Sequence, residues 1–377
     1  MPLELFFDLV FVLALTQCTA LMAVGAGWAD LAKGLLVLAL MWWSWVGYAW
    51  LTSVVDPEEG AVRFAIFAAM AAFLVVALCI PEAFGDSRML FAVAYSVVRF
   101  SQIALFMLAS RDEPALRASV LGLAGGTALG CGLLIVGALF ENDTTQAAIW
   151  SAALLFDMLE PYLFGSEGWQ LHPSHFVERH GLIIIIALGE SIVAIGVGAH
   201  GHVDAGVVTA AVLGVAIAGA LWWLYFDIVA LVAERRLSNA EVGPERNEIA
   251  RDSFSYLHFP MVAGIVMLAL GLKKTVEHVD EPLKLVPAVA ALGGTAVYLL
   301  AHVAFRWRNV HRFSWQRLLC AAALCALIPV GTEVDALVTL ALVLVLLAAL
   351  IAYETTHFRD LRARLRHQLE SDQGASA

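Results

Sequence analysis

Charged side chains are scarce in this chain of 377 residues: Asp, Glu, Lys and Arg make up 15% of it, while 61% is hydrophobic. Soluble domains carry charges at about a quarter of their positions. The apolar residues form runs that recur almost from end to end, and most runs are long enough to cross about 30 Å of hydrocarbon. The sequence therefore predicts an all-α fold, a polytopic bundle of transmembrane helices.

Several kinds of functional motif are also missing. No basic stripe with interleaved aromatic residues occurs, so we expect no nucleic acid as a partner. The five cysteines lie in apolar runs and form no CxxC pair, which is typical of small buried side chains. Neither clustered His boxes nor a Ser or Cys nucleophile beside a base is present. We therefore expect a protein that is not an enzyme and that holds no cofactor.

Twelve apolar segments are expected to span the bilayer. Their approximate bounds are 3–24, 34–54, 61–80, 88–110, 115–140, 145–164, 177–199, 206–233, 253–272, 283–305, 315–331 and 334–354. Of the 22 Lys and Arg residues, 16 lie on the side that would hold both termini, 5 lie on the other side, and Arg99 lies inside a span. Because cytoplasmic loops are enriched in Lys and Arg, we expect the N- and C-termini in the cytoplasm.

The two halves of the sequence share a pattern of aromatic and charged residues. The matching positions, in the same order, are Trp42 and Trp43 with Trp222 and Trp223, Tyr95 and Arg99 with Tyr298 and His302, and Arg117 with Arg317. This order indicates two parallel six-helix repeats, as in duplicated transporters, with chance similarity as the alternative. The expected organisation is a first repeat at 1–164, a linker at 165–176, a second repeat at 177–356 and a basic amphipathic cytoplasmic tail at 357–377.

Polar side chains inside the apolar runs are the candidate functional residues, because an ionised group in hydrocarbon is costly unless it is paired or hydrated. Arg99 and Glu190 are expected near the bilayer midplane, each as the other's preferred partner. They are interpreted as lining a transport or proton pathway; the alternative is a buried ion pair that only fixes helix register. The other candidate pathway residues are Glu4, Asp8, Gln17, Gln102, Asp157, Glu178, Ser191, Asp227, His258 and His302.

Three further patterns have plain structural interpretations. Gly122, Gly126 and Gly130 form a small-xxx-small pattern typical of close helix packing, and we assign it no chemistry. The tryptophans near the ends of the second and eighth spans are typical of interfacial belts, with an aromatic-lined substrate cavity as the alternative. Glu4, Glu160 and Glu178 lie near span ends, so they could instead extend to the membrane surface.

Several segments together resemble the bacterial low temperature requirement A family. These segments are Leu3–Phe11, Trp42-Trp43 ahead of Asp56-Pro57, Glu178–Leu182 with Leu188–Ser191, Trp222-Trp223 with Phe226-Asp227, and His258–Pro260 after Tyr256. The likeness covers nearly the whole chain. It implies a multi-pass protein of the bacterial inner membrane, linked by its family name to growth in the cold, and it implies no particular reaction or substrate.

The favoured function is a secondary transporter or ion-coupled permease. Its midplane site would contain Glu190, Arg99 and Asp157, with Asp8 and Asp227 toward the cytoplasmic exit. A cation channel and a non-transporting scaffold or sensor in cold adaptation are the alternatives; Phe6–Asp8 matches in part a signature of a potassium-channel family. The expected partners are the lipid bilayer and a small solute, ion or proton, and assembly as a homodimer is left open.

Overall fold

The computed structural model describes residues 2–54, 60–163, 168–201 and 203–359. Long helices make up most of these residues, and within them the only β pairing is an isolated bridge between Pro282 and Asp335. Ten of the described helical segments are long and apolar enough to cross a membrane. The fold is therefore an all-α polytopic helical bundle, as the composition predicts.

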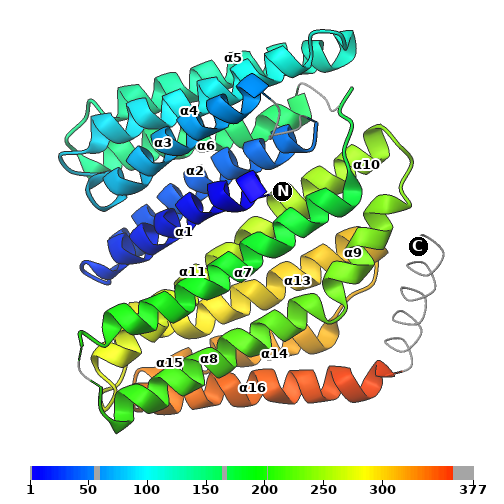
Figure 1. Ribbon diagram of the computed structural model, residues 1–377. Helices are drawn as coiled ribbons and strands as arrows, with labels where there is room; N and C mark the ends of the chain where they lie inside the picture. Colours follow the sequence, from blue (N-terminus) through cyan, green and yellow to red (C-terminus); the bar gives the residue numbers. More distant parts are fainter. Residues whose placement is uncertain (1, 55–59, 164–167, 202, 360–377) are drawn as a thin grey trace.

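The first half of the bundle consists of helices α1 to α6, drawn from blue to green in Figure 1. Their bounds are α1 (Pro2–Ala23), α2 (Trp28–Thr52), α3 (Gly60–Cys79), α4 (Arg88–Ala109), α5 (Pro114–Gly137) and α6 (Asp143–Leu163). Helix α1 packs on α2 and α3, and α3, α4, α5 and α6 follow as successive neighbours. Helix α2 contacts both α4 and α6 and so lies across the group.

The second half runs from α7 to α16. Its helices are α7 (Pro173–Gly198), α8 (Ala205–Phe226), α9 (Val229–Ser238), α10 (Pro244–Ile249), α11 (His258–Glu277), α12 (Leu285–Ala288), α13 (Gly294–Val310), α14 (Trp315–Ala326), α15 (Ile328–Gly331) and α16 (Ala336–His357). Two π-helical segments, Ala250–Tyr256 and Val289–Gly293, precede α11 and α13. Such wide turns are rare in proteins and are frequent at functional sites.

Each of the twelve expected spans coincides with a helix or a pair of helices, although the number of membrane crossings stays a prediction. The two that are absent from the ten long apolar segments correspond to α6 and α14. Helix α6 carries Asp157 and Glu160, and α14 has only 12 residues. The eleventh expected span is divided at Leu327, close to Pro329, because proline lacks the N–H that a continuous helix needs.

The same helix neighbours occur in both halves. The contacts α7–α8, α7–α11, α11–α13, α13–α14, α14–α16 and α8–α16 correspond in order to α1–α2, α1–α3, α3–α4, α4–α5, α5–α6 and α2–α6. Tyr95 on α4 donates a hydrogen bond to the carbonyl of Leu40 on α2, and Tyr298 on α13 donates to that of Leu221 on α8. The internal repeat stays a prediction, and these contacts support it.

The halves meet where α1 packs on α7 and α11 and α2 approaches the same two helices (Figure 1). The indole N–H groups of Trp42 and Trp50 reach across this boundary, to the carbonyl and hydroxyl oxygens of Ser255 at 2.8 and 2.9 Å. Trp42 is buried, and the belt interpretation is wrong for it because its N–H has a partner inside the protein. Trp222 on α8 remains 44% exposed, as a belt residue would be.

Two expectations fall partly on residues outside the described ranges. The linker was expected at 165–176, but α7 already begins at Pro173, a residue type that suits the first turn of a helix. Trp169, from the same segment, packs edge-on against Trp50 and Phe106. Most of the basic tail expected at 357–377 lies outside the described residues, beyond 359.

Candidate functional site

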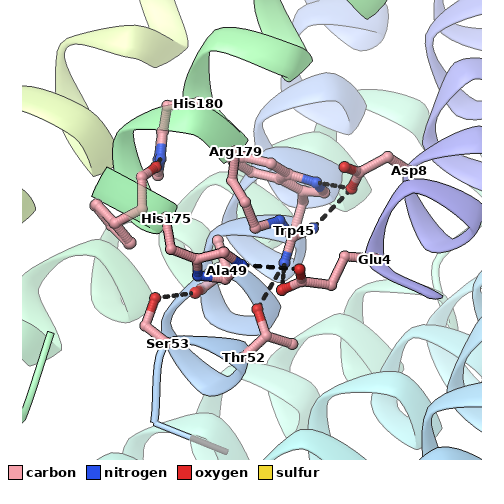
Figure 2. A network of polar contacts seen from close by, with 10 residues as sticks. Glu4, Asp8, Trp45, Ala49, Thr52, Ser53, His175, Arg179 and His180 are labelled. Atoms are coloured by element: carbon pink, nitrogen blue, oxygen red, sulfur yellow. Dashed lines mark hydrogen bonds and ion pairs between the residues drawn. The ribbon is translucent and has the colours of Figure 1, made fainter. Parts of the chain in front are cut away.

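Two of the segments that carry the family resemblance, Leu3–Phe11 and Glu178–Leu182, meet in a buried ion-pair network. Figure 2 shows this network from close by. Arg179 on α7 lies between two carboxylates of α1: its Nη2 is 2.8 Å from Asp8 Oδ1, and its Nη1 is 3.5 Å from Glu4 Oε1. Both acids and the arginine are almost completely buried. We call Glu4, Asp8 and Arg179 the junction network, because they join α1 of the first half to α7 of the second.

Neighbouring side chains hold the junction network in place. Trp45 on α2 donates its indole N–H to Asp8 at 2.8 Å, and the Arg179 guanidinium lies 5.4 Å from the Trp45 ring centre. Thr52 accepts from Arg179, also at 2.8 Å, and His175 contacts Glu4 at the same distance. Buried charges are tolerated when such partners replace water. Glu4 therefore does not extend to the membrane surface, and α1, α2 and α7 are fixed in one register.

Glu178, although named as a pathway residue from the sequence, is exposed. It precedes Arg179 by one residue, and consecutive positions on a helix face directions about 100° apart. The buried member of this pair is Arg179. The sequence pointed to this stretch correctly, but the residue that it selected faces away from the network.

The predicted pairing of Arg99 with Glu190 is wrong. Arg99 on α4 is 3.6 Å from Asp157 on α6 through its Nη2, whereas Glu190 on α7 accepts a hydrogen bond of 2.5 Å from the Thr16 hydroxyl on α1. Arg99 thus has its partners within the first half, while Glu190 faces α1 across the boundary between the halves. The approximate depth of each charge could be inferred from the sequence, but the helix beside it could not.

Arg99 and Asp157 belong to a second buried group in the first half. Arg99 donates to Gln102 at 3.0 Å and to Thr127 on α5 at 3.2 Å, and Glu160 lies one helical turn from Asp157. Neither Glu160 Oε1 nor Arg99 Nε has a hydrogen-bond partner among the described residues. An unpaired polar atom inside a protein is costly, so such atoms point to a site that another molecule or proton completes.

The glycines of α5 make room for these acids. A Cβ atom at Gly126 would lie 1.6 Å from Glu160 Oε1, and one at Gly130 would lie 2.4 Å from Asp157 Oδ1. Both distances are far shorter than the separation that two non-bonded heavy atoms can adopt. The small-xxx-small pattern therefore serves more than helix packing, because it lets two carboxylates lie against the backbone of α5 beside Arg99.

A cavity of about 100 Å³ opens beside Arg99 and Glu160, and we call it the first cavity. Helices α2, α4, α5 and α6 form most of its wall, and the π-helical segment Ala250–Tyr256 reaches it from the second half. Its aromatic lining matches the alternative interpretation of the tryptophans. The lining residues are Trp43, Val46, Gly47, Trp50, Arg99, Gln102, Ile103, Phe106, Leu123, Thr127, Glu160, Pro161, Trp169, Asn247, Arg251 and Ser255.

A larger cavity, of about 520 Å³, lies in the second half and is called the second cavity. Helices α8, α13, α14 and α16 contribute to it, and in the expected repeat these correspond to α2, α4, α5 and α6. It contains two residues predicted as pathway residues, Asp227 and His302. In its wall, Arg317 forms a bidentate ion pair with Glu354, at 2.9 and 2.8 Å.

The other predicted residues are dispersed. His258 is fully buried and contacts the Tyr225 hydroxyl at 2.8 Å, and its ring centre lies 5.3 Å from that of His180. Ser191 is buried next to Glu190, while Gln17 is half-buried on α1. Of the three residues expected in the midplane site, Arg99 and Asp157 lie together and Glu190 lies apart from them, and the structure does not gather the twelve predicted pathway residues in one place. It distributes most of them among the junction network, the two cavities and the Glu190–Thr16 contact.

Sequence reasoning missed several residues of these groups. Thr16 and Thr52 are not predicted from the sequence, because uncharged positions give little signal before the helix neighbours are known. Arg317 and Glu354 were assigned to loop and span ends. One signal was available: the resemblance segments included Arg179 itself, and a basic residue amid apolar ones requires an acidic partner.

The fold and its buried charges define a multi-pass helical membrane protein. The family model described as bacterial low temperature requirement A protein (LtrA) matches residues 1–352, so the chain belongs to this family, as its segments indicated. It is similar to Uncharacterized protein RA0937 of Rhizobium meliloti (strain 1021), with 30% identity over 308 residues that cover 78% of this chain and 74% of that protein. No solved structure matches the chain.

Proposed function

We propose that this membrane protein is a proton-coupled permease for a small carboxylate-bearing solute, which binds in the first cavity. The single observation that carries the proposal is that one cavity is lined by both the Arg99 guanidinium and a Glu160 carboxyl whose Oε1 has no partner among the described residues. In this proposal Arg99 binds the anionic group of the solute and Glu160 carries the coupled proton. Glu190, the midplane acid of the original hypothesis, is not required.

The remaining walls fit such a solute. Trp43, Trp50 and Trp169 offer apolar faces for its organic part, and Thr127 and Gln102 orient Arg99. Binding pockets for small molecules have this composition, a mostly apolar lining with a few placed polar groups. Intramembrane ionisable residues that face a cavity commonly mark substrate or proton pathways.

The boundary between the halves supplies an element that could open the cavity. Arg251 and Ser255 of the π-helical segment Ala250–Tyr256 line it from the second half, and Ser255 is held by Trp42 and Trp50 of α2. Relative motion of the halves would move this segment against α2. Motion of one repeat against another is the usual way in which transporters alternate access.

Uptake into proteoliposomes tests the proposal. Vesicles with an inward proton gradient would be offered a panel of radiolabelled amino acids and dicarboxylates, which cross bare lipid poorly. We expect at least one to accumulate above the level in protein-free vesicles. We expect Arg99→Gln/Asp157→Asn, which stays neutral overall, to lower this uptake by about tenfold or more, the equivalent of one lost charge-assisted hydrogen bond.

The matched control is Arg111→Gln, which removes an exposed arginine from the first half. It should transport as the unchanged protein does. Accumulation of none of the solutes, or equal uptake by Arg99→Gln/Asp157→Asn and the unchanged protein, would remove the first cavity from the mechanism. Unitary currents in planar bilayers would indicate the channel alternative instead.

A non-transporting scaffold or sensor is the second candidate, and one observation favours it. Arg99 and Glu190 each have a partner nearby, as expected of charges that only fix the packing of helices. If the role is structural, Arg99→Met/Asp157→Leu should restore the stability lost in Arg99→Met alone and should also restore growth in the cold. If the protein is a permease, Arg99→Met/Asp157→Leu should recover stability but not solute uptake.

A further inference from the structure

We infer that the second cavity is a separate site that binds a phosphate ester whose other end carries hydrogen-bond donors, such as a glycerol phosphate group. The cavity lies in the second half, and its wall is formed by α8, α9, α13, α14, α16 and the segment before α14. Its use does not depend on the permease proposal, because none of its lining residues belongs to the first cavity.

Arginines supply the anion-binding side of the site. Arg306, Arg312 and Arg317 all line the cavity. Arg317 is already engaged by Glu354 through two short contacts, so that this pair contributes no net charge. Arg306 is held by the Ser314 hydroxyl at 2.9 Å and lies 5.7 Å from the Phe358 ring centre. With Asp227 as the remaining acid, the lining has one positive charge in excess, which favours an anionic phosphate group.

Two residues that line the same cavity each carry a buried polar atom without a partner among the described residues. These atoms are Nε2 of His302 and Oδ1 of Asn309, and both side chains are at least nine-tenths buried. Asn309 donates its amide to the Phe305 carbonyl, so its free oxygen needs a donor. A ligand hydroxyl would supply one, whereas a bare inorganic anion would not. The site thus offers cations for a phosphate and acceptors for hydroxyl groups.

The size of the cavity also favours an ester over a bare ion. A volume of about 520 Å³ is within the range of small-molecule pockets, roughly 300–1,000 Å³. Leu224, Ile228 and Val232 give it apolar walls that would accept the start of an acyl chain. The excess of Lys and Arg in the loops at this end of the bundle predicts that it faces the cytoplasm. On that side of a membrane, basic pockets between helices bind lipid headgroups. The ester could therefore come from a lipid or from a soluble metabolite.

Native mass spectrometry of the full chain in detergent tests the inference. The probes are phosphatidylglycerol, phosphatidylcholine and glycerol 3-phosphate. We expect phosphatidylglycerol or glycerol 3-phosphate to bind, and phosphatidylcholine, whose headgroup has no donor, to bind more weakly. Competition distinguishes the sources: a lipid site keeps phosphatidylglycerol when glycerol 3-phosphate is in excess, whereas a site for a soluble ester binds glycerol 3-phosphate and releases the lipid.

Variants locate the binding in the second cavity. Arg306→Gln/Arg312→Gln should weaken binding of the preferred probe by about tenfold or more, and Arg306→Lys/Arg312→Lys should retain most of it. Arg111→Gln/Arg117→Gln, which removes two exposed arginines from the first half, is the charge-matched control and should bind as the unchanged protein does. Val229→Trp, which fills the cavity while keeping its arginines, should also weaken binding. The inference fails if neither phosphatidylglycerol nor glycerol 3-phosphate binds. It also fails if the preferred probe binds equally to Arg306→Gln/Arg312→Gln, Val229→Trp and the unchanged protein.

Discussion

In the predicted repeat the two cavities would occupy matching places in the two halves, but their charges come from different helices. In the first half the arginine is Arg99 on α4, and α5 contributes glycines that admit the acids of α6. In the second half His302 is the residue that the predicted repeat matches to Arg99, while Arg317 on α14 pairs with Glu354 on α16. The same set of helices can therefore hold an arginine–carboxylate pair in two ways.

The difference leaves each cavity with a different unsatisfied group. Glu160 Oε1 is without a partner in the first cavity, whereas in the second Glu354 is paired with Arg317, and Arg306 and Arg312 also line the wall. An unpaired carboxyl suits a proton, and additional arginines suit a phosphate. In our two proposals, the first cavity would therefore bind the solute and the coupled proton, and the second the phosphate ester.

The largest expected effect is at the junction between the halves. Arg179→Met leaves Glu4 and Asp8 buried without their cation, which should cost about 3–5 kcal/mol and prevent stable insertion or folding. Detergent-solubilised protein would be followed by thermal unfolding and gel filtration. Normal stability of Arg179→Met would mean that the two halves are held together by apolar packing alone.

The second-half pair should be the next most sensitive. Arg317→Met removes a two-pronged contact and the bond from Arg317 to the Leu224 carbonyl, so we expect a loss of about 3–5 kcal/mol. Arg317→Met/Glu354→Leu should recover most of this loss, because no uncompensated charge remains. The same thermal assay measures both variants. If the double variant is no better than the single one, the pair has a role beyond compensating charge.

The first half should respond to added volume on α5. Gly126→Ala places a methyl group against Glu160 and should destabilise the protein by about 1–3 kcal/mol, the usual cost of overpacking. Gly132→Ala, on the same helix with nothing within 4 Å of the new atom, is the control and should be neutral or stabilising. Equal unfolding temperatures for the two variants would contradict the packing of Glu160 against α5.

The smallest effect is expected at Glu178. Because this side chain is exposed, Glu178→Gln should change stability by no more than about 0.5 kcal/mol. Thermal unfolding of Glu178→Gln and Arg179→Met in parallel would measure the contrast between these adjacent residues. A large loss in Glu178→Gln would show that the acid faces the protein after all.

Much of the bundle could be predicted from the sequence, and the partners of its charges could not. Apolar periodicity alone places a helix at each expected span, since burial in lipid demands long apolar helices. The acid at Asp8 and the base at Arg179 also stand out against apolar neighbours. Which charge meets which, however, depends on helix rotation and order. Arg99 could have reached Glu190 had α4 and α7 been neighbours, and the pattern of either helix does not exclude it.

The coupling of proton and solute in Glu160→Gln is the most direct test of the central claim, that the first cavity is a transport site in which Glu160 carries the proton. Proteoliposomes would be assayed for gradient-driven uptake and for solute exchange at equal pH. Because glutamine resembles a permanently protonated glutamate, we predict that exchange persists while gradient-driven accumulation falls to the level of protein-free vesicles. Full gradient-driven accumulation by Glu160→Gln would contradict the claim.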